Sequence, residues 1–192
     1  INQQNAAQNA LDNAGIDATN IDFILGNTDS YWTRDYGPWW IVNGENKMSV
    51  VDFTYNRPRL NDNQAPLKIS EHLDVPYYAS DIIHAGGNYM TDGFGTAASS
   101  DLVFEENLNT NEDILNLMNS YYGIDNYHVI NDPNNTYIDH IDCWGKYLSP
   151  TKVLIRDVPE SHPQYDQIEE TASYFINTLN KWNELWEVYR IW

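Results

Sequence analysis

Residues 41–55 read Ile-Val-Asn-Gly-Glu-Asn-Lys-Met-Ser-Val-Val-Asp-Phe-Thr-Tyr, and this stretch decides the fold class. Asn43-Gly44 is a typical hairpin turn, because both residues tolerate positive φ angles. It joins a strand that ends at Val42 to a returning strand over Met48–Tyr55, which is rich in β-branched and aromatic residues. The sequence therefore predicts an antiparallel strand pair here.

Outward from this pair, short strands alternate with helices. Apolar spacing and end signals predict helices over 2–14, 67–73, 111–121 and 162–182. Further strands are predicted over 21–25, 77–83, 127–130, 144–148, 152–155 and 188–192, with a short strand and a glycine turn over 85–93 and a strand pair over 96–104. Hairpins that alternate with helices indicate an α/β fold with mixed rather than purely parallel strand pairing.

The composition excludes several classes of protein. The 192 residues include 28 acidic and 10 basic side chains, for a net charge of -18. Such a surface repels phosphate backbones and acidic lipid headgroups and favours cationic ligands, so we expect no nucleic acid partner. No apolar run approaches the roughly 20 residues of a membrane span, so we expect no membrane insertion. The 14 Tyr and 7 Trp indicate a packed core, and the single Cys143 excludes an intrachain disulfide.

The segment Tyr-Ile-Asp-His-Ile-Asp-Cys-Trp at 137–144 is one candidate for chemistry. If it is extended, His140 and Asp142 share one face and Cys143 faces away from them. A carboxylate beside an imidazole stabilises its protonated form, which suits a proton shuttle. A surface turn is the alternative. A metal site lacks a second pair of ligands, because the other histidines are widely spaced: His72, His84, His128 and His162.

The segment 31–40 places an acid and a base among large aromatic residues. Asp35, between Trp32, Tyr36 and Trp39, would lie in a partly dry pocket, where a carboxylate favours a bound cation. The alternative is a structural ion pair between Arg34 and Asp35 beneath the aromatic side chains.

Arg57-Pro58-Arg59 contains two of the few basic residues. Pro58 favours extended geometry at Arg57, which would point both guanidinium groups to one side. Two such groups match a bound carboxylate bidentately. Pairing with surface acids such as Asp62 is the alternative.

Gly86-Gly87-Asn88, followed by Asp92-Gly93, lets the backbone approach a ligand or a neighbouring strand closely. A tight bend without a ligand is the alternative interpretation. The spacing does not match a phosphate-binding loop, and no lysine follows.

Three motifs occur in order: Trp-Thr-Arg-Asp-Tyr-Gly-Pro-Trp at 32–39, Gly-Gly-Asn followed by Asp-Gly at 86–93, and His-Ile-Asp at 140–142. Together they resemble the bacterial peptidylarginine deiminase and agmatine deiminase family of guanidine-modifying enzymes, from about Tyr31 onward. The resemblance implies a pentein fold, a five-bladed αβ propeller with a polar site on its axis. It also implies hydrolysis of a guanidinium to a ureido group and ammonia through a cysteine thiouronium intermediate, without metal or cofactor.

The resemblance assigns roles to individual residues. Asp35 and Asp142 match the carboxylates that hold the guanidinium, and His140 matches the proton shuttle. The implied substrate-binding residues are Trp32 against the aliphatic stem, Tyr137 and Ile138 along the pocket, and Arg57 and Arg59 on the substrate carboxylate.

The arginine pair favours peptidyl-arginine as the substrate, preferably C-terminal arginine in peptides or proteins. Agmatine deiminases have a Trp-Gly-type sequence in this loop. Alternatives are agmatine deimination, a non-catalytic arginine-binding module, or an unrelated acidic scaffold. The resemblance also implies secretion or a cell-envelope location.

The family's nucleophilic cysteine lies well C-terminal to the His-Ile-Asp motif. Cys143 is instead interpreted as a small buried apolar residue. We therefore expect residues 1–192 to be a partial pentein catalytic domain without the N-terminal strand region and the nucleophile-bearing segment. On this view the chain is inactive alone and pairs with a complementary C-terminal segment of the same enzyme.

Overall fold

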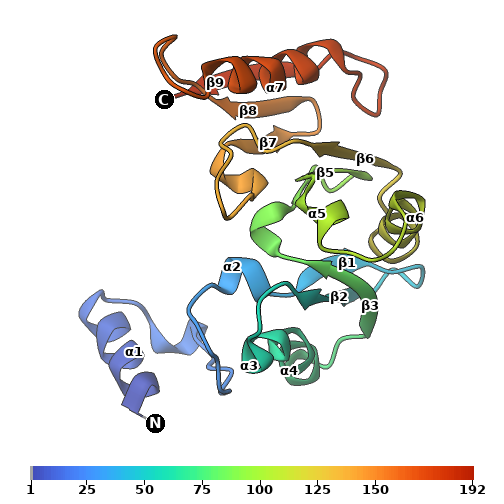
Figure 1. Cartoon of the computed structure of the whole chain (residues 1–192). Helices are drawn as coiled ribbons and strands as arrows, with labels where there is room; N and C mark the ends of the chain where they lie inside the picture. Colours follow the sequence, from blue (N-terminus) through green and yellow to red (C-terminus); the bar gives the residue numbers. More distant parts are fainter. Residues whose placement is uncertain (1) are drawn as a thin grey trace.

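Three units, each a mixed three-stranded sheet with its helices, form most of the chain in the computed structural model, which describes residues 2–192 (Figure 1). The three sheets share one topology. In each sheet the first two strands pair antiparallel, and the second and third pair parallel. A helical crossover leads to each third strand, as parallel neighbours require. The predicted α/β fold with mixed pairing is confirmed, and the three sheets form an open stack.

The first unit contains the hairpin predicted from residues 41–55, with Trp39 opposite Val51. The side chain of Asn43 closes the turn by accepting the amides of Glu45 and Lys47, each at 3.0 Å. The left-handed residue is Asn46, with φ 60°, rather than Gly44. The elements of this unit are α2 (Thr33–Tyr36), β1 (Trp39–Val42), β2 (Met48–Tyr55), α3 (Leu60–Asn63), α4 (Ala65–Leu73) and β3 (Tyr77–His84).

In the second unit, the helix predicted from Asn111 is confirmed, and capping residues explain where it begins and ends. Thr110 and Asp113 form a reciprocal capping box, and Gly123 ends the helix with φ 66°. Its elements are η2 (Gly86–Asn88), β4 (Met90–Thr91), β5 (Thr96–Ser100), α5 (Leu102–Glu105), α6 (Asn111–Tyr122) and β6 (Asn126–Ile130).

The third unit repeats the pattern with one long helix. Its elements are η3 (Ile141–Cys143), β7 (Gly145–Ser149), β8 (Lys152–Arg156), α7 (Tyr165–Asn177) and β9 (Glu187–Ile191). Before the first unit lie α1 (Asn2–Asn13) and η1 (Ala18–Asn20). No helix among residues 2–192 combines the length and the apolar character that crossing a bilayer requires.

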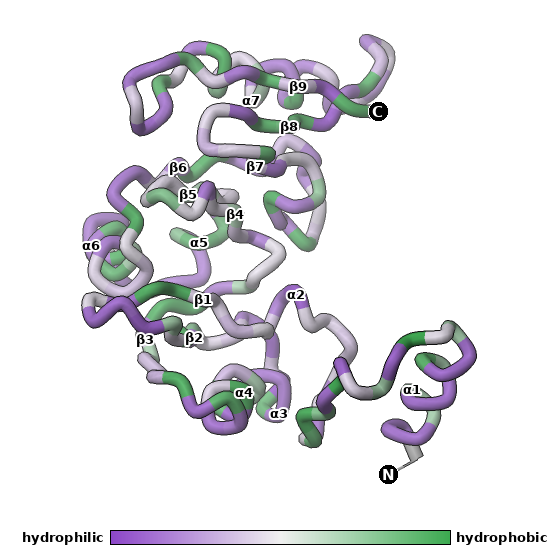
Figure 2. Tube along the Cα trace, turned by 180° about the vertical axis from the view of Figure 1, so that it is seen from behind, coloured by the Kyte–Doolittle hydropathy of each residue, from purple (hydrophilic) through white to green (hydrophobic). Residues whose placement is uncertain are grey.

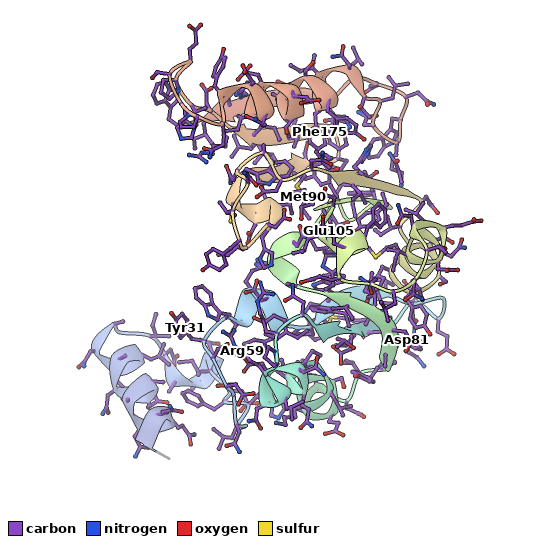
Figure 3. The ribbon with its side chains drawn as sticks, in the orientation of Figure 1. Tyr31, Arg59, Asp81, Met90, Glu105 and Phe175 are labelled. Carbon is purple, nitrogen blue, oxygen red and sulfur yellow. The ribbon has the colours of Figure 1, made fainter. Side chains whose placement is uncertain are left out.

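The hydrophobic cores lie between neighbouring units. Ala97 packs in the cluster shared with the first unit, whereas Ala98 packs in the cluster shared with the third, because successive strand residues face opposite sides. Met90 and Phe175 belong to the cluster shared with the third unit (Figure 3). Strands β1 and β8 are largely hydrophobic, whereas α1 is mostly hydrophilic (Figure 2). At about 1.5–3 kcal/mol for each large buried side chain, this packing holds the units together.

Three predicted elements were wrong or displaced. Residues 21–25 form no strand, because Asp22 accepts the amide of Phe23 and Leu25 is exposed without a partner strand. Residues 96–104 form one strand followed by helix α5 rather than a strand pair. The helix predicted over 162–182 is α7, which spans only Tyr165–Asn177.

Candidate functional site

Three single helical turns, α2, η2 and η3, occupy equivalent places in the three units. Each comes immediately before the first strand of its unit, β1, β4 or β7. Figure 1 shows these turns one after another along the same side of the stack. The repeat therefore brings together residues that are far apart in the sequence.

The side chains of these turns converge on Gly87. A Cβ atom added to this glycine would lie 2.6 Å from Asp35 Oδ1, 2.6 Å from His140 Nδ1 and 3.2 Å from Asp142 Oδ2. Only a residue without a side chain fits between these groups. The structure thus brings together the two carboxylates and the imidazole that the sequence singled out, around one point of backbone.

His140 is buried, with its Nδ1 atom 3.6 Å from Asp35 Oδ1. Its Nε2 atom is also buried and makes no hydrogen bond with any residue of the described part of the chain. Burial lowers the pKa of His140, and the charges of Asp35 and Asp142 oppose that change. The Nδ1 atom faces the two carboxylates and makes no hydrogen bond with the described residues, so this nitrogen can exchange a proton with a molecule bound between Asp35 and Asp142.

The two carboxylates are held differently. Asp35 Oδ1 accepts the backbone amide of Gly87 at 3.2 Å, which fixes α2 against η2. Burial raises the pKa of Asp142; His140 opposes this rise and the charge of Asp35 adds to it. Asp35 is largely buried, and Asp142 is exposed as a residue although its carboxylate is partly buried. Two neighbouring carboxylates favour a cation with several donors, and a planar guanidinium has five. The alternative ion pair between Arg34 and Asp35 is not formed among residues 2–192.

The extended geometry considered for residues 137–144 is not formed, and the segment contains a turn. Asp139 has φ 56°, and the chain then forms the helical turn η3. Cys143 is exposed rather than buried, and its Sγ atom lies 3.8 Å from Asp142 Oδ1 instead of facing away. Although the residue is exposed, neighbouring atoms shield its sulfur partly from water, and this shielding and the charge of Asp142 raise the pKa of the Cys143 thiol. A thiol that holds its proton in this way is a poor nucleophile.

The arginine pair also differs from its predicted geometry. The amide of Arg59 donates to the carbonyl of Arg57 at 2.7 Å, so this segment bends instead of extending. The Arg57 guanidinium lies 3.7 Å from Glu106 Oε1, and its positive charge contributes to lowering the pKa of His140. The positive charge of Arg57 therefore acts on the imidazole of His140.

Arg59 donates to the hydroxyl of Tyr55 at 3.1 Å and to Ser30 Oγ at 3.3 Å, beside the exposed Tyr31 (Figure 3). Asp62, the alternative partner of the arginines, is fully buried and instead accepts the amides of Asp29 and Ser30. The two arginines are thus not neutralised by Asp62.

The other predicted substrate-binding residues lie on the same loops as the acids. Trp32 directly precedes α2, is half-exposed and packs on Tyr31 with ring centroids 4.7 Å apart. Tyr137 is 92% exposed, and Ile138 is half-buried two residues before His140. Their roles toward a ligand stay predictions.

A groove and a cavity lie next to the turns α2, η2 and η3. A groove of about 740 Å³ runs along β1 and β4 and reaches Arg34 and Gly86. A smaller cavity of about 310 Å³ is lined by Asp142, Cys143 and Trp192. Residues 2–192 contain no group of three or more His, Cys, Asp or Glu side chains arranged to hold a metal ion.

Sequence reasoning missed the structural importance of the Gly-Gly-Asn motif, which it left as either a ligand approach or a simple bend. Gly87 forms the floor between the acids and His140, and the Asn88 side chain reaches the backbone of η3. The adjacent glycines were the signal, because the second one must leave space for other side chains.

Comparisons with known proteins agree with this architecture. The chain is 26% identical to the agmatine deiminase of Pseudomonas syringae pv. syringae over 197 residues, covering 91% of the chain and 52% of that protein. It is 30% identical to the agmatine deiminase of Ectopseudomonas mendocina, covering 78% and 45% respectively. The solved agmatine deiminase of Enterococcus faecalis superposes with a TM-score of 0.79 at 19% identity, over 86% of the chain and 50% of that structure.

The chain spans about half the length of the curated relatives it matches. The family of Porphyromonas-type peptidyl-arginine deiminases matches residues 1–191. The resemblance inferred from the three motifs is confirmed: this chain belongs to the Porphyromonas-type peptidyl-arginine deiminase family.

Proposed function

We propose that the full-length protein hydrolyses a guanidinium group to a ureido group and ammonia, and that this chain supplies the groups that hold the guanidinium and move its protons. The observation that carries the proposal is the convergence of Asp35, His140 and Asp142 on Gly87. The family membership of the chain gives independent support.

The chemistry follows from the groups present. Asp35 and Asp142 would accept the N–H groups of the guanidinium and hold its plane beside His140. A cysteine thiol would pass its proton to His140 as its sulfur attacks the central carbon, and one nitrogen would leave as ammonia after receiving that proton from His140. Water would then add to the thiouronium carbon and give a proton to His140. The C–S bond would break, the sulfur would take the proton back from His140, and the hydroxyl proton on the carbon would pass to solvent as the ureido product leaves.

The attacking cysteine is not Cys143 in this proposal, because its thiol has a raised pKa and lies beside Asp142. The family resemblance instead implies a cysteine in the part of the relatives that this chain does not span. The cavity beside Asp142 and Cys143 is where such a segment would approach the site. We also propose that further units of the same kind complete the three sheets to a closed propeller.

The substrate has two candidates, each favoured by a different observation. The curated relatives are named agmatine deiminases, and these names favour the smaller substrate over the peptidyl-arginine expected from the sequence. Agmatine carries an amine and no carboxylate, and the acidic charge of the chain favours a doubly cationic molecule.

The arginine pair favours the second candidate, a substrate with a carboxylate such as C-terminal arginine. Arg57 contributes positive charge at His140, and both Arg57 and Arg59 contribute it at Tyr55, close to Asp35. A carboxylate would be attracted by this charge, whereas the amine of agmatine would be repelled. Glu106 beside Arg57 offsets part of that difference.

Steady-state kinetics of the full-length protein test these proposals. We expect ammonia release from at least one of agmatine and a peptide ending in arginine, lost when Asp35 is changed to Ala. If Arg57→Ala lowers kcat/KM only for the peptide, the carboxylate-bearing substrate is supported. If the variant improves agmatine turnover and the peptide is not hydrolysed, agmatine is the substrate. Binding of guanidines without turnover in complete protein would contradict the enzymatic proposal.

A further inference from the structure

The Gly-Gly-Asn motif contains a buried amide side chain that the proposed chemistry does not use. Asn88 is only 2% exposed. Its Oδ1 atom accepts two backbone amides, that of Ser100 at 2.8 Å and that of Ile141 at 3.2 Å. Ser100 ends strand β5, and Ile141 follows His140 directly. One oxygen therefore connects the η2 turn, the second sheet and the segment that holds the imidazole.

The segment around His140 is held on both sides of the histidine. Asn88 holds the amide of Ile141, and the hydroxyl of Ser100 donates to the carbonyl of Asp139. Asp139 has the left-handed φ of 56°, so this backbone is not a regular strand that would hold its own position. The place of His140 thus depends on contacts from η2 and β5.

The same turn holds the opposite side of the site. The amide of Gly87 donates to Asp35 Oδ1 at 3.2 Å, one residue before the side chain that fixes Ile141. The turn itself is closed by the amide of Asn88, which donates to the carbonyl of Ala85 at 2.9 Å. The relative position of Asp35 and His140 is therefore set through two adjacent residues of one helical turn.

We propose that Asn88 is a positioning residue, which sets the distance and orientation of His140 and Asp142 relative to Asp35 without touching the substrate. The proposal rests on the function proposed above. Its physical basis is that a shift of about 1 Å in a reacting group can lower a rate about a hundredfold. Loss of the Asn88 oxygen leaves two buried amides without this partner and releases the η3 turn from η2.

Three variants of the full-length protein separate positioning from general stability. Asn88→Leu keeps the size and removes the acceptor. Asn88→Asp keeps the acceptor and adds a negative charge. Asn107→Leu is the matched control, because Asn107 is similarly buried and also binds backbone, but it holds Ile83 and Val103 rather than the site.

We expect Asn88→Leu to lower kcat about a hundredfold, while Asn107→Leu loses similar thermal stability and less than threefold in kcat. Asn88→Asp should retain kcat within about tenfold. The acid limb of the pH profile of kcat should move to higher pH in Asn88→Asp, because a nearby carboxylate raises the pKa of an imidazole. Equal losses of kcat in Asn88→Leu and Asn107→Leu, or equal losses in the Leu and Asp variants of Asn88, would overturn the proposal.

A measurement without turnover keeps this inference separate from the proposed function. Amide hydrogen exchange at Ile141 and the NMR titration of the His140 ring should both change in Asn88→Leu and stay unchanged in Asn107→Leu. If these changes occur in a protein that hydrolyses no guanidine, the positioning stands and the proposed function fails. If Ile141 remains protected and the His140 titration is unchanged, Asn88 does not position this segment.

Discussion

Two buried histidines lie close together and differ in how fully their ring nitrogens are paired. His84, just before η2, accepts the amide of Ala85 on Nδ1 at 2.9 Å, and its Nε2 atom lies 3.2 Å from the hydroxyl of Tyr127. His140, across the turn, has a buried Nε2 atom without a partner among the described residues. The first ring is held by the packed structure, whereas the Nδ1 atom of the second faces Asp35 and Asp142, where a ligand would bind.

The electrostatics of the two rings sharpen this difference. Burial lowers the pKa of His84 to about 3, so the ring stays neutral at ordinary pH. The pKa of His140 is also lowered by burial, but Asp35 and Asp142 act in the opposite direction. Burial alone therefore does not identify a reactive histidine; an unengaged nitrogen beside opposing charges does.

The largest effect should come from removing the ring at 140. His140→Asn should lower kcat about 10²–10⁴-fold in the full-length protein, because general acid and base catalysis typically contributes that much. The matched variant His84→Asn should lower thermal stability and change kcat less than tenfold. Thermal unfolding and ammonia release measured on both proteins check this, and equal kcat losses would remove the distinction between the rings.

The next largest loss of activity should come from removing the charge of Asp35 or Asp142. Asp35→Asn and Asp142→Asn should each lower kcat/KM about 10–100-fold, since a hydrogen bond to a charged group contributes about 1.5–3 kcal/mol. Each change should also lower the pKa of His140 further, because both acids raise it. An unchanged His140 titration in either variant would show that the acid lies outside its electrostatic reach.

The free energy of unfolding should fall with pH because His84 binds a proton more readily in the unfolded chain than in the fold. The unfolded chain binds a proton at His84 below about pH 6.5, whereas the folded chain binds it only near pH 3, so this group destabilises the fold as pH falls through that window. Between pH 6 and pH 5 the unfolding free energy of the natural protein should drop about 1 kcal/mol more than that of His84→Asn. Urea unfolding at the two pH values measures the difference; equal drops would mean that His84 is solvated in the fold.

The smallest effect should come from Cys143. Cys143→Ser should leave kcat within about twofold, because the residue is exposed and its thiol has a raised pKa. Ammonia release measured over a range of pH checks this. A loss of several orders of magnitude would make Cys143 the nucleophile and contradict the proposed role of the rest of the protein.

Local signals explain what could be predicted from the sequence. The hairpin at 41–55 and the helix from Asn111 carry their own turn and capping residues, so both form where the sequence places them. The segment 137–144 carries no such signal. Its turn depends on Asn88 and Ser100, which lie in another unit, so the sequence of the segment could not decide between an extended geometry and a turn.

The candidate site was predicted in part for the same reason. The motifs identified Asp35, His140 and Asp142, and the structure brings them together, but through three repeated turns rather than one strand face. The exposure of Cys143 was missed because it follows from the η3 turn. The bend at Arg59 was missed because the chain hydrogen-bonds across Pro58 instead of extending through it.

The most direct test of the central claim is a crystal structure of full-length His140→Asn protein with a guanidine substrate bound. In the proposed binding mode, guanidinium nitrogens lie about 2.7–2.9 Å from carboxylate oxygens of both Asp35 and Asp142, over Gly87. A guanidinium bound elsewhere, or held by neither acid, would contradict it.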